Sequence, residues 1–190
     1  MVETDLALLA AKLVAEMREA GTASSPPDLN RFAAQISNRF QARKDEFAIL
    51  RISSDARMLC FLFPSKLSQV GTIPLNSPHS LAAKTIRDKR GEIVNNFPKY
   101  RHQTVFESVN ISSQEEAAPI QKIMSSPMIA DGKVVGVIQI SRKVREGERV
   151  GSDFTPADLA QLDTVCSILG KYLAELPPPP LIPPKPPPED

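Results

Sequence analysis

The side chains that most often carry chemistry are few in this chain and stand far apart in the sequence. There are two cysteines, Cys60 and Cys166, and two histidines, His79 and His102. A structural zinc site needs about four such ligands converging on one point, so these scattered pairs do not predict one. Both cysteines lie among apolar residues, which favours buried, reduced thiols over the alternative of a disulfide.

The remaining sequence contains no familiar catalytic pattern. It has no Gly-x-Ser-x-Gly elbow and no glycine-rich phosphate loop. Its carboxylates are dispersed, with no pair in an apolar context that would favour acid–base catalysis. A small basic cluster is interleaved with Glu146 and Glu148, as in a solvated loop; its members are Arg142, Lys143, Arg145 and Arg149. The sequence therefore predicts a protein that is not an enzyme, and it leaves any cofactor unknown.

The composition is that of a soluble globular protein and disfavours two classes of partner. The 190 residues are 42% hydrophobic and 24% charged, with a net charge of +1. This balance predicts neither nucleic-acid binding nor attachment to an anionic membrane. The apolar run from Leu6 to Ala15 is interrupted by Lys12 and is too short to span a bilayer. The acidic start is unlike a signal peptide, so cytoplasmic residence is expected.

The strongest structural signal is the stretch from Ser125 to Arg142. Two apolar runs are joined there by Asp131-Gly132, a pair that suits the positive φ angles of a two-residue hairpin turn. The register that follows pairs Ala130 with Lys133, Met128 with Val135 and Ser126 with Val137. Apolar residues on both faces of the second run predict a central strand, and Gly136 predicts that another backbone or a helix passes close by.

Other elements follow from apolar periodicity and turn residues. Helices are predicted over 5–20 and 28–44, and a strand hairpin over 46–52 and 58–63. Ser77-Pro78 predicts the start of a third helix that runs to about Lys89. The later predictions are a strand at 92–94, an irregular segment over 95–114, a short helix over 114–121 and a strand over 123–130.

The last predicted helix begins at Thr155, an N-cap residue followed by Pro156 and by a capping-box acid at Asp158. Its apolar positions recur as in a coiled-coil seam; they are Leu159, Leu162, Cys166, Leu169, Leu173 and Leu176. Together the elements predict an α+β fold with a central antiparallel sheet, in which the N- and C-terminal helices pack on one face and the middle elements on the other.

The predicted organisation has three parts. Residues 1–27 form an N-terminal helix and a Ser/Pro linker, 28–176 form the domain, and 177–190 form a proline-rich tail. The tail holds nine of the 18 prolines, which predicts disordered, extended polyproline II structure. Its Pro-x-x-Pro-x-Lys segment at 180–185 could bind a protein partner, although a plain terminal tail is the simpler interpretation.

On these motifs the chain resembles the GAF domain family over roughly 29–173. The most specific similarity runs from Ser-x-Pro-Met at 125–128, through the Val-Val-Gly-Val-Ile-Gln-Ile strand, to Phe-Thr-Pro-Ala-Asp at 154–158. The resemblance implies a GAF-like (PAS/profilin-like) fold and a sensory or signalling role. It also implies a ligand pocket between the sheet and the segments from Ile73 to Met124.

Carried onto this sequence, the family pocket implies small-molecule contacts from wall and floor residues. The wall would be formed by Ile93, Asn95, Phe97, Tyr100 and Phe106. The floor would be formed by Ser126, Met128, Val137 and Gln139, since the predicted register puts the first three on one face with Val135. The alternative is that all of these are ordinary core residues of a structural scaffold with no ligand.

Known activities of the family find no matching residues here. The cysteine that holds a linear tetrapyrrole and the cysteine set of free methionine sulfoxide reductases are missing from the pocket segment, as is the Asn-Lys-x-Phe-x-Asp-Glu pattern of cyclic-nucleotide binders. Haem-binding members use a histidine, but a lone imidazole is weak evidence for haem. We therefore expect a non-enzymatic module, and the helical seam further predicts a homodimer formed through the terminal helices.

Overall fold

The computed structural model describes residues 2–21, 28–68, 71–99, 118–145 and 147–180. Its helices are α1 (Val2–Ala20), α2 (Asn30–Arg39), α3 (Leu81–Asp88) and α5 (Pro156–Glu175). Its strands are β1 (Phe47–Ile52), β2 (Met58–Phe63), β3 (Thr72–Pro74), β4 (Glu92–Val94), β5 (Ile120–Ala130) and β6 (Lys133–Lys143).

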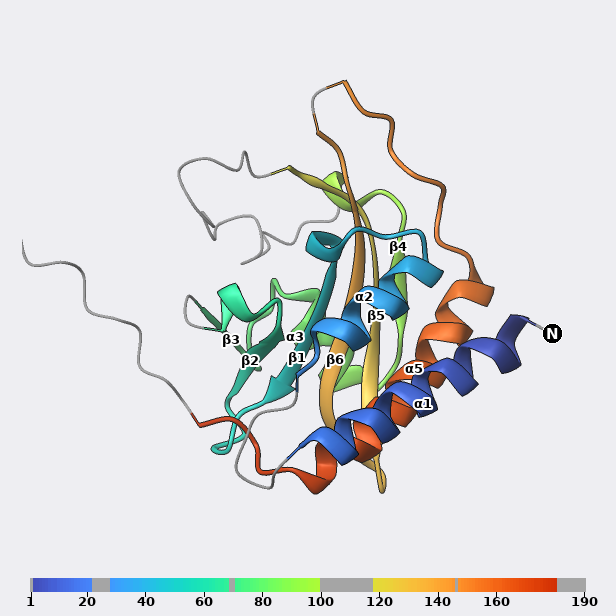
Figure 1. The fold of residues 1–190 in the computed structure, drawn as a ribbon. Coiled ribbons are helices and arrows are strands. Elements are labelled where there is room, and N and C mark those ends of the chain that lie inside the picture. Colours follow the sequence, from blue (N-terminus) through green and yellow to red (C-terminus); the bar gives the residue numbers. More distant parts are fainter. Residues whose placement is uncertain (1, 22–27, 69–70, 100–117, 146, 181–190) are drawn as a thin grey trace, which may run out of the picture.

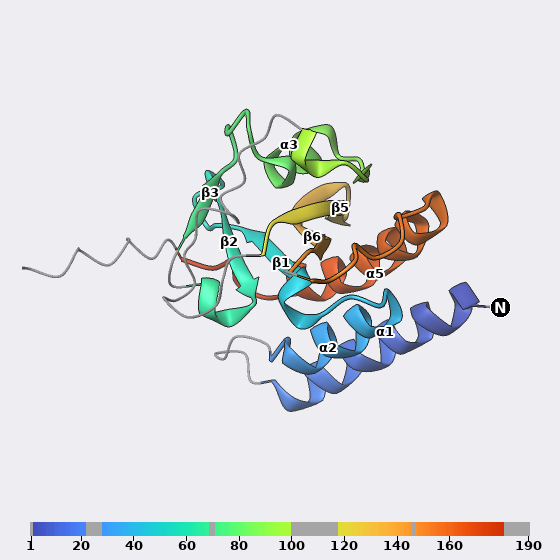
Figure 2. The same ribbon diagram turned by 90° about the horizontal axis from the view of Figure 1, so that it is seen from above.

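The six strands form one antiparallel sheet in the order β3-β2-β1-β6-β5-β4. Helices α1, α2 and α5 lie on one side of this sheet, and α3 lies on the other (Figures 1 and 2). We call these two sides the α5 face and the α3 face. The α+β class, the central position of the β5–β6 hairpin and the placement of the terminal helices on one face are all confirmed.

The hairpin register differs from the prediction because β6 contains a bulge. Ala130 pairs with Lys133 as predicted, but Met128 pairs with Gly136 and Ser126 with Ile138. One extra residue on β6 lies between the pairs Ile129–Val134 and Met128–Gly136. A bulge reverses the alternation of side chains beyond it, so Val135 packs into the α5-face core while Val137 packs into the α3-face core.

Helix α5 begins at the predicted cap and is buried as the predicted seam requires. Thr155 Oγ1 accepts a hydrogen bond from the Asp158 backbone N–H at 3.2 Å, and the Thr155 N–H donates to Asp158 Oδ2 at 2.7 Å. The fully buried seam positions of α5 belong to one hydrophobic core with inward side chains of α1. The seam that motivated the dimer prediction is therefore covered to a large extent within this chain.

The N-terminal helix α1 packs into the hydrophobic core of the domain. Leu6, Ala10, Leu13 and Val14 are buried in the same cluster as α2, α5 and the sheet. Helix α2 ends at Arg39, earlier than the predicted Lys44, and Gln41 just beyond it has a φ of 53°. An L-residue in this left-handed region ends a helix, which accounts for the difference.

Two other predicted boundaries are wrong. Helix α3 is capped by Ser80, whose hydroxyl accepts from the Ala83 N–H at 3.2 Å, and it does not start at Ser77-Pro78. The helix predicted over 114–121 conflicts with β5, which already begins at Ile120; residues 114–117 lie outside the described part. The start of α3 is therefore set by the Ser80 cap and not by Ser77-Pro78.

The start of the proline-rich tail is attached to the domain. The buried Arg51 guanidinium donates to the carbonyl oxygens of Leu176 at 2.6 Å and Pro177 at 2.8 Å. The Ser54 N–H donates to the Pro179 carbonyl at 3.1 Å. Residues 181–190 lie outside the described part, so the predicted disorder of the tail stays a prediction. None of the helices in the described ranges is both long enough and apolar enough to cross a membrane.

Candidate ligand-binding site

Three polar side chains meet in the interior on the α3 face. Ser125 Oγ lies 2.8 Å from Thr85 Oγ1 of α3 and 3.2 Å from Gln139 Nε2 of β6. Thr85 Oγ1 also lies 2.9 Å from the Leu81 carbonyl oxygen. Because that carbonyl can only accept, the Thr85 proton is directed there, and Ser125 donates to Thr85 while accepting from Gln139. The three residues thus form one directed hydrogen-bonded chain, which we call the polar triad.

The polar triad is buried and bordered by apolar side chains. The exposed fractions of Thr85, Ser125 and Gln139 are 1%, 0% and 4%. On the α3 face two apolar clusters are present, and α3 contributes to both of them. Their members are Ala48, Leu50, Leu59, Phe61, Leu67, Ile73, Ala82, Ile86 and Val137 in one, and Leu81, Val94, Phe97, Ile120 and Ile123 in the other.

Burying polar groups in such surroundings costs free energy unless their hydrogen bonds are made. Each of the two hydroxyl groups donates one hydrogen bond and accepts another. Gln139, in contrast, uses only one of its two amide N–H groups for the bond to Ser125. A primary amide has two donors and a carbonyl acceptor. Gln139 is therefore the member of the triad that is best suited to contact a polar group of a small molecule.

Only part of the predicted pocket lies on this face. Phe97, Val137 and Gln139 are buried there, as the prediction requires. Tyr100 and Phe106 lie outside the described residues. The predicted floor is wrong in its composition, because the bulge in β6 separates Val137 and Gln139 from Ser126 and Met128.

Four predicted contact residues have other roles. Ile93 and Met128 pack into the α5-face core. The Ser126 hydroxyl donates to Asp163 of α5. The Asn95 amide is bound to the backbone of Phe154, with Nδ2 donating to its carbonyl and Oδ1 accepting from its N–H, both at 2.9 Å. Asn95 therefore holds the start of α5 in place, and these side chains do not point to the polar triad.

Sequence reasoning missed Thr85 and Ser125. Thr85 is a buried residue of α3, but a single threonine among apolar neighbours gives no sign of its partners. Ser125 is adjacent to the predicted Ser126, and the extra residue in β6 means that Ser125, not Ser126, lies on the same face as Gln139. Ser125 lies directly opposite Gln139 across the hairpin, and this pairing identifies it as a site residue once the true register is known.

Neither cysteine is suited to thiol chemistry. Both are free and buried, as predicted. Burial raises the pKa of Cys166 to about 12, and its Sγ donates to the Ser126 carbonyl at 3.4 Å on the α5 face. Burial also raises the pKa of Cys60, with Asp55 adding to the effect. Among the described residues no cluster of His, Cys, Asp and Glu side chains could hold a metal ion.

We expect iodoacetamide to leave Cys166 unmodified in the folded protein at pH 8. With a pKa of about 12, only about one thiol in ten thousand is ionised at that pH, and the thiolate is the reactive form. Peptide mapping by mass spectrometry, which distinguishes Cys166 from Cys60, checks this, with complete labelling in denaturant as the control. Rapid labelling of Cys166 in the native protein would show that the thiol is accessible and ionised.

Comparisons with known proteins agree with this architecture. A family model for the GAF domain matches residues 23–174. No curated protein matches the sequence. The fold is similar to the GAF domain of an Acinetobacter phosphoenolpyruvate-protein phosphotransferase, with a TM-score of 0.64 and 17% identity over 90% of this chain and 92% of that chain.

Two further solved structures show the range of similar proteins. The A. aeolicus nlh2 GAF domain in an inactive state has a TM-score of 0.61 and 12% identity, over 92% of this chain and 96% of that chain. The free methionine-R-sulfoxide reductase from Neisseria meningitidis, in complex with its substrate, has a TM-score of 0.60 and 15% identity, over 90% of this chain and 88% of that chain. At these identities the similarity shows the fold alone. Because the family model spans most of the sequence, this protein belongs to the GAF domain family.

Proposed function

We propose that this protein is a non-enzymatic sensory module that binds a small molecule on the α3 face, next to the polar triad. GAF domains are in general sensory or regulatory modules. The observation that carries the proposal is the buried Gln139 amide, held by Ser125 and Thr85 among apolar side chains. A few placed polar groups in an apolar setting are typical of small-molecule sites.

The methionine sulfoxide reductases among the similar structures raise an enzymatic alternative. That chemistry needs reactive thiols, and here the pKa of each cysteine is raised by burial. Cys166 also lies on the opposite face of the sheet from the polar triad. These features favour sensing over thiol catalysis. The other alternative is a scaffold whose polar triad only stabilises the core.

We include homodimerisation in the proposal as the route by which the module signals to partners. Since α1 covers much of the α5 seam within the chain, a dimer through the terminal helices would use the outer side of α1. Leu8, on that side, is 69% exposed and is the most exposed large apolar side chain among the described residues. A Leu8→Glu variant that stays as dimeric as the wild type in light scattering would contradict this part of the proposal.

A triple variant separates ligand binding from core stability. In Thr85→Val/Ser125→Ala/Gln139→Leu all three partners become apolar together, so no buried donor or acceptor is orphaned within the triad. Replacing both sides of a buried hydrogen bond in this way is nearly neutral or stabilising. We expect an unfolding free energy within about 1 kcal/mol of the wild type or above it, and loss of any molecule that co-purifies.

Ser126→Ala is the matched control, because it removes the neighbouring hydroxyl on the opposite face. We expect this variant to keep the co-purifying molecule. Chemical denaturation gives the stability, and native against denaturing mass spectra give the bound mass. Retention of the bound molecule by the triple variant would exclude the polar triad as its site.

A further inference from the structure

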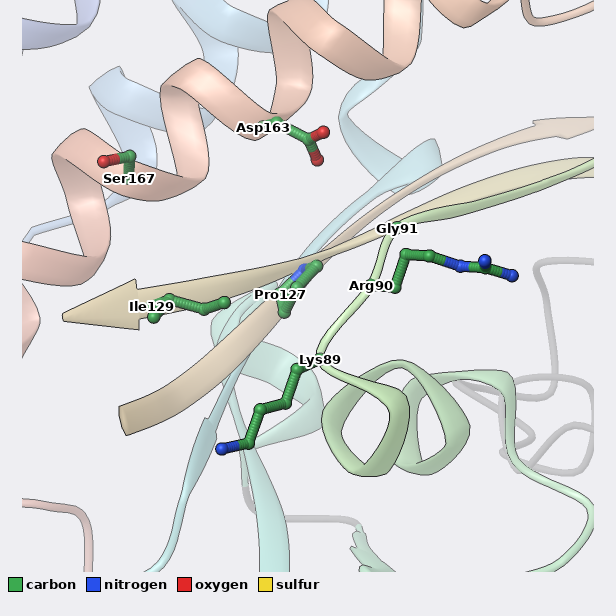
Figure 3. Close-up of a pocket in the computed structure, with 7 residues that line it drawn as sticks. All are labelled: Lys89, Arg90, Gly91, Pro127, Ile129, Asp163 and Ser167. Atoms are coloured by element: carbon green, nitrogen blue, oxygen red, sulfur yellow. The ribbon is translucent and has the colours of Figure 1, made fainter. Parts of the chain in front are cut away.

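The outer edge of β5 is only partly covered. The short strand β4 pairs with β5 at Ile123, Met124 and Ser125. Beyond Ser125 the chain of β4 turns away through Gly91, Arg90 and Lys89 towards α3, and no strand in the described part of the chain pairs with that edge of β5 over 126–130 (Figure 3). Unpaired strand edges can add an extended peptide as a further strand.

The position of Pro127 shows which backbone groups face this edge. Proline has no N–H to give to a neighbouring strand, so the Pro127–Val137 pair must be one of the non-hydrogen-bonded pairs between β5 and β6. Backbone groups alternate in direction along a strand. The Ile129 N–H and C=O, two residues further on, therefore point outward to the open edge, as does the Pro127 C=O.

The open edge forms the bottom of a cavity of about 380 Å³. One wall is α5, with Asp163 and Ser167, and the other is the corner between α3 and β4, with Lys89, Arg90 and Gly91 (Figure 3). A Cβ on Gly91 would lie 2.8 Å from Leu159 Cδ1, so this corner sits tightly on α5 where the groove begins. A groove between a strand edge and a helix can hold a short extended segment.

The groove lining carries a net positive charge. No side-chain hydrogen bond or ion pair is seen for Lys89 or Arg90 among the described residues, and both are exposed. The acid in the lining, Asp163, accepts a hydrogen bond from Ser126; counted with Lys89 and Arg90, it leaves the lining a formal net charge of +1. Lys171, one helical turn beyond Ser167, is a further exposed cation on α5. Complementary charge steers partners to such a surface.

We propose that this groove binds an extended acidic peptide segment of a partner protein, which adds a short strand to β5. The Ile129 N–H and C=O would pair with the peptide backbone. Acidic side chains of the segment would contact Lys89 and Arg90. The free edge from Pro127 to Ala130 limits the paired part of the segment to a few residues. The groove is formed by different residues from the polar triad, so the protein has separate surfaces for a small molecule and for a protein partner.

The probe is the peptide acetyl-Glu-Val-Glu-Val-Glu-amide, titrated into the full chain. We expect saturable amide shifts in NMR spectra around Ile129 and Lys89. The distinguishing readout is hydrogen exchange at the Ile129 N–H, which should become protected in the complex because only strand pairing gives that N–H a partner. A purely electrostatic contact would leave its exchange rate unchanged.

Charge reversal tests the cations directly. Lys89→Glu/Arg90→Glu should weaken peptide binding at least about tenfold, since two partly exposed ion pairs are lost and replaced by repulsion. The matched control is Lys12→Glu/Arg149→Glu, which makes the same change in charge at exposed positions outside the groove lining. The control should bind within about twofold of the wild type.

Three outcomes would overturn the proposal. The first is the absence of any shift at Ile129 or Lys89 with millimolar peptide. The second is binding that is equally strong for the lysine counterpart of the peptide. The third is protection of the Ile129 N–H in the protein alone that grows with protein concentration, which would assign the edge to a contact between two copies of this chain.

Discussion

Gly136→Ala is expected to abolish stable folding or to lower the unfolding free energy by about 4 kcal/mol or more. A Cβ at this position would lie 2.2 Å from the Leu50 carbonyl oxygen, 2.6 Å from Met128 Cε and 3.1 Å from Arg51 Cα. The Met128 side chain could move. The β1 backbone cannot, because β1 is fixed between β2 and β6 in the middle of the sheet.

Gly71→Ala is the control for this substitution. A Cβ at Gly71 would meet no atom within 4 Å, and its φ is not in the left-handed region. Gly→Ala at such a site is neutral or slightly stabilising through the unfolded chain. Thermal unfolding followed by circular dichroism compares the two variants. Equal melting temperatures would contradict the close approach of the β1 backbone to Gly136.

Arg142→Met is expected to lower the unfolding free energy by about 3 kcal/mol. The buried guanidinium donates to the carbonyl oxygens of Phe40 at 2.9 Å and Gln41 at 2.8 Å, where α2 ends. Its Cζ also lies 4.7 Å from the centroid of the Phe154 ring, just before α5. One side chain of β6 therefore connects the end of α2 to the start of α5.

Methionine keeps much of the arginine stem but satisfies neither carbonyl oxygen, so both lose their charged donor. For a chain of this size we expect a fall in melting temperature of roughly 6 to 12 °C. Arg145→Met is the matched control, because Arg145 is exposed and its side chain pairs with the surface residue Asp45 at 3.3 Å. Such surface pairs contribute little. If the two variants were equally stable, Arg142 would have no connecting role.

Local signals in the sequence predicted much of the fold. Asp131-Gly132 predicted the central hairpin, with φ values of 48° and 74° in the structure. Thr155 and Asp158 predicted the start of α5 because both capping hydrogen bonds lie within four residues of chain. In these cases the residues that determine the geometry are neighbours in sequence.

The candidate site was less predictable because it depends on contacts between distant segments. The bulge in β6 places Val137 on one face and Met128 on the other, yet nothing in the Val-rich run indicates where an extra residue is accommodated. Thr85 and Ser125 are 40 positions apart and meet only when α3 has docked on β5. Asn95 likewise finds its partner, Phe154, only after α5 is in place.

The central claim, that a small molecule binds beside the polar triad, is tested most directly by native mass spectrometry of the wild-type protein purified from its own source. The account predicts a discrete non-covalent mass above that of the polypeptide, which disappears when the same sample is denatured. The polypeptide mass alone under both conditions would contradict the account and favour the scaffold.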